Sequence, residues 1–154
     1  MTRTSLLASL FIPLLLASGC AHRQAVQAPQ APGVIVADAA VRAAQDDPAR
    51  GITGTFALKV QAIGSDQRML YLSSERDYRH PLNISLAISP TLQPALEDTL
   101  GVKLATLQGR RILVNGTARR VRIAFISGNG QPSNKYYYQT QIRVTDPGQV
   151  QLAP

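Results

Sequence analysis

The segment "LQGRRILVNGTARRVRIAF", residues 107–125, carries the pattern that decides the fold. Apolar and polar residues alternate along it, which is typical of a β-strand with one buried face. The apolar set is even-numbered as far as Ala118 and odd-numbered from Val121 onward. Because alternation changes phase only where an extra residue enters a strand, we expect a bulge or corner between Gly116 and Arg120. A long strand bent in this way favours a small closed barrel.

Shorter alternating runs predict four more strands. These are residues 55–63, a strand around Leu70 and Leu72, residues 84–88 and residues 135–144. Between the third and fourth strands, in residues 89–101, leucines recur at every fourth position and therefore share one face of a helix. Pro90 and Pro94 suit the start of that helix, and Gly101 suits its end. The predicted order is three strands, one helix and two strands.

The first nineteen residues have the character of an export signal. A positive start at Arg3 precedes an apolar run that is too short for a membrane-spanning helix. The run closes on "LASGC", residues 16–20, which resembles the lipobox of bacterial lipoproteins, where the cysteine is acylated after cleavage. The alternative is a plain secretory signal with a chance cysteine. The resemblance implies a signal peptide over 1–19, a lipid such as palmitate on Cys20, and an envelope location. Ala21 favours the outer membrane, with the protein facing the periplasm.

Residues 20–50 are rich in alanine, glutamine and proline, which predicts an extended tether after the lipidated cysteine. An alanine-rich helix over 37–45 is compatible with the composition, but a helix so short is marginal without packing. Strand alternation begins near Ile52, so we place the folded domain at residues 51–154. The chain has 16 Lys and Arg against 9 Asp and Glu, a net charge of +7. Such a charge attracts phosphate-bearing partners, although solubility alone would also account for it.

Three stretches resemble the OB-fold domains of the tRNA-anticodon-like and nuclease-associated group. They are "YLSSERDYRHPLNISLAI" (71–88), "LQGRRILVNGTARR" (107–120) and "TQIRVTDPGQVQL" (140–152). The resemblance spans roughly residues 52–152. It implies a mainly β fold, a five-stranded Greek-key barrel with one helix between strands 3 and 4. Domains of this group are mostly binding modules, so the resemblance bears on fold more than on ligand.

The charged loop over residues 75–80 is the strongest candidate for chemistry. Glu75 and Asp77 could serve as an acid and a base or hold Ca²⁺. However, only six acids follow Gly51, too few to complete a second cluster of metal ligands. We therefore expect a structural connection with locally paired charges and with the Tyr78 ring packed on the barrel end. The sequence predicts no catalytic residue, no metal and no cofactor.

Ligands of OB barrels usually bind across the second and third strands and the neighbouring loops. Arginines can contact phosphate, and tyrosine rings can stack on a ligand. The candidate ligand-binding residues are Tyr71, Arg76, Tyr78, Arg79, Arg119, Arg120, Arg122 and Arg143. The predicted function is a membrane-anchored, non-enzymatic binding module whose partner is an envelope protein or an anionic ligand. The alternative is a lipoprotein that binds single-stranded nucleic acid through a basic Arg/Tyr face.

Overall fold

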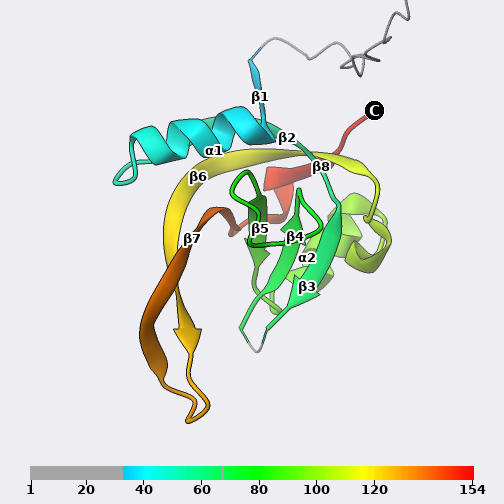
Figure 1. The fold of residues 1–154 in the computed structure, drawn as a ribbon. Helices are drawn as coiled ribbons and strands as arrows, with labels where there is room; N and C mark the ends of the chain where they lie inside the picture. Colours follow the sequence, from blue (N-terminus) through cyan, green and yellow to red (C-terminus); the bar gives the residue numbers. More distant parts are fainter. Residues whose placement is uncertain (1–32, 67) are drawn as a thin grey trace, which may run out of the picture.

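The computed structural model describes residues 33–66 and 68–154, and it is mainly β (Figure 1). The predicted signal peptide and Cys20 lie outside the described residues. The strands are β1 (Val34–Val36), β2 (Ile52–Lys59), β3 (Ala62–Ser65), β4 (Leu70–Ser73), β5 (Ile84–Ile88), β6 (Arg111–Ile126), β7 (Pro132–Val144) and β8 (Val150–Leu152). The α-helices are α1 (Ala37–Asp46) and α2 (Gln93–Leu100), and short 3-10 turns occupy Leu104–Thr106 and Pro147–Gln149. No helix of the described part is long and apolar enough to cross a membrane.

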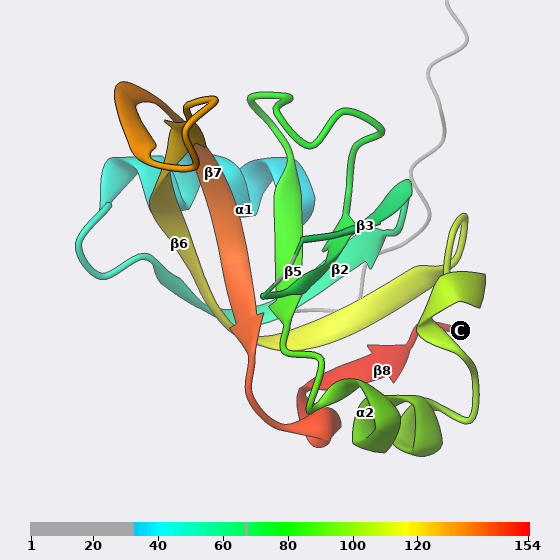
Figure 2. The same ribbon diagram turned by 90° about the horizontal axis from the view of Figure 1, so that it is seen from below.

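The strands form one curled sheet in the order β1-β2-β6-β7-β5-β4-β3, and β8 pairs with β6 beside this path (Figure 2). The β1–β2 and β5–β7 pairs are parallel, and the others are antiparallel. Only Val60 and Gln61 separate β2 from β3. The Val60 amide donates to the Arg110 carbonyl, and the Gln61 amide donates to the Ser73 carbonyl. The chain thus passes from the side of β6 to the side of β4, and the sheet curls around the core. This arrangement is consistent with an OB-like barrel.

The prediction of five strands and one helix was wrong in its counts, because the described residues hold eight strands and two α-helices. The run over 55–63 is divided at Val60 and Gln61, where the backbone changes its hydrogen-bonding partner. β1 and β8 are short strands added along β2 and β6. Their three-residue lengths give too little alternation for a sequence pattern to reveal.

Helix α1 lies in the segment that the sequence analysis assigned to a tether, so the folded body begins before residue 51. The helix lies across β2 and β6 (Figure 1), with Ala40, Val41 and Ala44 fully buried. Tertiary packing of this small apolar face stabilises a helix that would be marginal in isolation. The earlier part of the predicted tether, up to residue 32, lies outside the described residues.

The phase change along β6 does not come from a bulge between Gly116 and Arg120. Pairing with β2 runs without interruption up to Ala118, and pairing with β7 runs from Ala118 to Ala124. The register shift lies further on, between Ala124 and Ile126. The apolar positions change parity because β6 leaves the barrel after Ala118. Beyond that point the covered face of β6 is the one that carries Val121 and Ile123, which pair with Gln139 and Tyr137 of β7.

The core lies inside the curl of the sheet and is closed by the two helices. Phe56, Leu72, Leu86 and Ile142 are fully buried within the sheet, together with Leu96 of α2. At Gly116 a Cβ would lie 2.9 Å from Ile142 Cγ2 of β7. A larger residue at this position would therefore require the Ile142 side chain to move.

A buried carboxylate fixes α2 to the following turn. Glu97 Oε2 accepts a hydrogen bond of 2.7 Å from Lys103 Nζ, and Oε1 accepts from the Gln93 side chain and the Leu104 amide. The hydrogen bond from Lys103, followed by that from Gln93, lowers the pKa of Glu97 from 4.5 to about 2. The carboxylate is therefore ionised throughout the physiological range.

Candidate functional site

A cleft of about 470 Å³ opens on the face of the sheet that looks away from the core. Alternation along β4, β5 and β7 determines this face. Leu72, Leu86 and Ile142 point inward, so their neighbours point outward into the cleft. Its lining includes Ile63, Asp66, Tyr71, Ser73, Arg76, Tyr78, Ser85, Ile123, Tyr137, Gln139 and Gln141. The volume lies within the range of small-molecule sites.

The floor of the cleft is polar and almost completely buried. The hydroxyl groups of Ser73 and Ser85 lie 3.1 Å apart on the paired strands β4 and β5. The side-chain amide of Asn83 donates to Ser85 Oγ at 2.8 Å and to the Tyr78 carbonyl at 3.1 Å. Its Oδ1 accepts from the Glu75 amide. Asn83 therefore ties the charged loop to the floor, and the serine hydroxyls are held in fixed positions.

Three tyrosines line the cleft. The rings of Tyr78 and Tyr137 have centres 6.3 Å apart, and Phe125 packs against Tyr137 from the other side at 5.2 Å. Burial raises the pKa of both Tyr71 and Tyr137 above 10.0. The phenols of Tyr71 and Tyr137 therefore stay neutral, and each offers an aromatic ring for apolar contact and a hydroxyl for hydrogen bonding.

Among the lining residues, Asp66 is the sole carboxylate, and it is occupied by its own turn. Its Oδ1 accepts from the backbone amides of Arg68 and Met69, both at 2.8 Å, and its Oδ2 accepts from the Tyr71 hydroxyl. The Arg68 amide is the strongest influence holding the pKa of Asp66 below its ordinary value. An ionised carboxylate fixed in this way orients Tyr71. The residues described contain no group of three metal-binding side chains.

The charged loop, residues 75–80, forms one wall of the cleft. Arg79 Nε lies 3.3 Å from Asp77 Oδ1, and the Arg79 amide holds the pKa of Asp77 below its ordinary value. The expectation that Tyr78 packs on the barrel end was wrong. Its ring is 50% exposed and lies between Tyr137 and the Arg79 guanidinium. The buried residue that anchors the exposed loop is Asn83, through its hydrogen bonds to the Glu75 amide and the Tyr78 carbonyl.

The eight predicted binding residues do not form one surface. Tyr71, Arg76 and Tyr78 line the cleft, and Arg79 stacks on Tyr78 at its edge. Arg119 pairs with Gln141 in the β6–β7 register, so it is on the same face as the cleft, but it is not among the lining residues. Arg120 and Arg122 lie on the opposite face of the hairpin, and Arg143 lines a separate hollow with Ser89 and Thr91.

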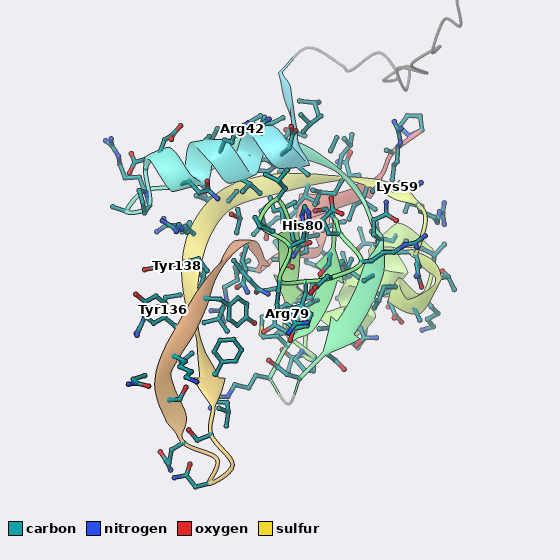
Figure 3. The ribbon with its side chains drawn as sticks, viewed as in Figure 1. Arg42, Lys59, Arg79, His80, Tyr136 and Tyr138 are labelled. Atoms are coloured by element: carbon teal, nitrogen blue, oxygen red, sulfur yellow. The ribbon has the colours of Figure 1, made fainter. Side chains whose placement is uncertain are left out.

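Sequence reasoning missed Ile123, Gln139 and Gln141 on the hairpin, and it did not distinguish Tyr137 from Tyr136 and Tyr138. Ile123, Tyr137, Gln139 and Gln141 share one face, and Tyr136 and Tyr138 project on the other side, away from β3 and β4 (Figure 3). The signal was present in "YYYQTQ", residues 136–141, where alternation separates Tyr137 from both neighbouring tyrosines. Because Ile142 points inward, the same alternation places Tyr137 on the outer face. What the pattern did not indicate was that this outer face forms a cleft.

The chain is thus a mainly β protein whose curled sheet is consistent with an OB-like barrel and carries a ligand-sized hollow on its outer face. No family model matches the chain, and no curated protein matches it. Among solved structures, the chain is similar to the aspartyl tRNA synthetase from Entamoeba histolytica at 12% sequence identity and a TM-score of 0.35. The similarity covers 66% of this chain and 18% of that protein. A likeness this distant does not bear on what the chain binds.

Proposed function

We propose that the chain is an OB-fold binding module, anchored in the bacterial cell envelope through a lipid on Cys20, that holds a ligand in the cleft without transforming it. The observation that carries the proposal is the position of the cleft over β4 and β5. These correspond to the second and third of the five strands expected for an OB barrel, with β2 and β3 together in place of the first. OB barrels bind oligonucleotides and oligosaccharides across this face and its flanking loops. The anchor rests on the lipobox-like "LASGC" alone.

The lining favours a polar ligand with flat or apolar portions. Tyr71, Tyr78 and Tyr137 offer rings, while the amides of Gln139 and Gln141 offer both donors and acceptors. The Gln141 amide already donates to Gln139 Oε1 at 2.8 Å, so the two glutamines present a fixed pattern. Arg76 supplies a positive charge at the wall, which suits one anionic group on the ligand.

A binding role suits the cleft better than catalysis because its titratable groups are not arranged for proton transfer. Asp66 is held ionised by backbone amides, and the half-buried phenols of Tyr71 and Tyr137 have a raised pKa. General acid–base chemistry needs a group poised near the working pH within reach of the substrate. His80 lies in the charged loop but is not among the residues that line the cleft.

The alternative function, single-stranded nucleic acid on an Arg/Tyr face, has less support. Its residues divide between the cleft, the opposite face of the hairpin and the hollow at Arg143. The affinity for a nucleic-acid strand should also fall steeply as the salt concentration rises, because phosphate contacts release counterions. A salt titration with an oligonucleotide separates this alternative from a mostly uncharged ligand.

Native mass spectrometry tests the proposal. The chain is incubated with the small-molecule fraction of a bacterial envelope extract, beside the variants Tyr137→Ala and Tyr136→Ala. We expect an adduct on the wild-type chain and on Tyr136→Ala that is lost from Tyr137→Ala. An adduct that survives equally in both variants would place the ligand elsewhere, and no adduct on the wild-type chain would oppose a small-molecule binding role.

A further inference from the structure

The face of the β6–β7 hairpin opposite the cleft carries a ladder of arginine and tyrosine side chains. Arg122 pairs with Tyr138 across the two strands, and Ala124 pairs with Tyr136. The Arg120 guanidinium lies 3.9 Å from the centre of the Tyr138 ring, and that of Arg122 lies 4.1 Å from the centre of the Tyr136 ring. We call Arg120, Arg122, Tyr136 and Tyr138 the Arg–Tyr face.

The hairpin ends in exposed apolar side chains. It extends beyond the barrel, and its tip lies far from α2 in both views (Figures 1 and 2). At this end Ile126 is 65% exposed and Phe125 is 44% exposed. Both rings of the Arg–Tyr face are about half exposed as well. Apolar and aromatic groups thus meet solvent together on a projecting element.

The charge of the hairpin has one sign. Residues 111–144 contain no Asp or Glu, and their basic residues are Arg111, Arg119, Arg120, Arg122, Lys135 and Arg143. Within the described residues, Arg120 Nε is buried without a hydrogen-bond partner. Because this nitrogen is buried, an external partner can reach only the terminal nitrogens of the guanidinium. A run of basic side chains without acids attracts an anionic partner.

We propose that the Arg–Tyr face and the hairpin tip dock on an anionic lipid surface. Tyrosine rings favour the boundary between headgroups and acyl chains, where the ring is apolar and the hydroxyl remains hydrated. Arginines beside them contact phosphate, and each basic group near such a surface strengthens binding. Ile126 supplies the apolar group that enters the boundary, whereas Phe125 packs on Tyr137 on the cleft side of the hairpin. This surface is distinct from the cleft, and the inference does not depend on the proposed ligand.

Lipid fits this face better than nucleic acid because of the stacked arginines and the apolar tip. A guanidinium covers one face of the Tyr136 ring and one face of the Tyr138 ring, so a stacking base finds only the other face of each. The exposed aliphatic side chain of Ile126 has no role in base stacking. Both features suit a headgroup boundary.

A fluorescent label at the tip tests the proposal. The full chain carries Cys20→Ser, to remove the natural thiol, together with Ser127→Cys for a polarity-sensitive dye next to Ile126. The matched control places the dye on α2 through Thr99→Cys, an exposed position on the far side. Each protein is titrated with phosphatidylcholine vesicles, with and without phosphatidylglycerol. All variants share residues 1–32, so any contribution of that segment is common to them.

We expect the dye at position 127 to shift to the blue on phosphatidylglycerol vesicles and to be quenched by brominated lipid, whereas the dye at position 99 stays unchanged. Arg120→Gln with Arg122→Gln should lower the partition coefficient roughly 30-fold. Arg110→Gln with Arg111→Gln removes two exposed charges from the barrel body and should keep most of the binding.

Four results would overturn the proposal. They are no response at position 127 on anionic vesicles, an equal response on neutral vesicles, an equal loss in both double variants, and a response at position 127 to a single-stranded oligonucleotide alone. The last would assign the face to nucleic acid.

Discussion

The side-chain amide of Asn83 donates a hydrogen bond of 2.8 Å to the hydroxyl of Ser85 at the floor of the cleft. The same side chain also holds the Glu75 amide and the Tyr78 carbonyl, so one buried residue positions both the floor and the loop that forms a wall. The shape of the cleft therefore depends on a polar residue that is 2% exposed.

Asn83→Ala should destabilise the chain by about 2–3 kcal/mol, because it leaves several buried polar groups without partners. Tyr78→Ala should cost less than about 1 kcal/mol, because the Tyr78 ring is half exposed. The hydrogen bond from Asn83 goes to the backbone carbonyl of residue 78, which the variant keeps. Urea unfolding of the two variants beside the wild-type chain gives the order. A larger loss in Tyr78→Ala would mean that the ring, rather than the amide, anchors the loop.

Helix α1 should be part of the cooperative fold. Val41→Ala removes buried methyl groups that contact the core and should cost about 2 kcal/mol, whereas Arg42→Ala, one position further and exposed, should change stability by less than about 0.5 kcal/mol. Thermal melting of both variants checks this. Equal melting temperatures would indicate that α1 does not contribute to the folded body.

These features mark where the sequence could and could not predict the fold. Alternation located β5 and β7, and the leucine spacing located α2, because each buries its apolar positions on one face of the barrel. The segment of α1 is too rich in alanine to show a wide apolar face. Its burial depends on the surface of β2 and β6, which no local pattern describes.

The site was predicted only in part for a related reason. Tyr71 was predicted to be a binding residue and does line the cleft, because alternation places it on the outer face when Leu72 points inward. The same alternation along β7 gave Tyr137 and its neighbours two opposite faces. Because Ile142 points inward, Tyr137 is on the outer face. That this face forms a cleft depends on the charged loop and β3, which is a tertiary property.

Acid should weaken the attachment of α2 through Glu97. Because its folded pKa of about 2 lies below the ordinary 4.5, the stability it contributes is fully present above pH 4.5 and is lost as the pH falls toward 2. We expect Glu97→Gln to melt below the wild-type chain at neutral pH, with the difference shrinking over that window. Asp98→Asn, at the exposed neighbouring position, is the control. A difference independent of pH would exclude the ionised carboxylate as the cause.

Cys20→Ser should release the protein from the membrane fraction of a bacterial host or leave it unprocessed, because acylation needs the thiol. Fractionation of cells after a high-salt wash measures this, and the wash removes proteins held by charge alone. If the variant still sediments with the outer membrane after the wash, a lipid on Cys20 is not what holds it.

The most direct test of the cleft compares two adjacent tyrosines on opposite faces of β7. Calorimetric titration with the ligand recovered from the envelope fraction is carried out on the wild-type chain, Tyr137→Ala and Tyr136→Ala. Loss of a central aromatic contact typically costs more than about 1 kcal/mol, so the Kd of Tyr137→Ala should rise by about fivefold or more. The Kd of Tyr136→Ala should match that of the wild-type chain. Equal affinities for Tyr137→Ala and the wild-type chain, or a loss confined to Tyr136→Ala, would contradict the account.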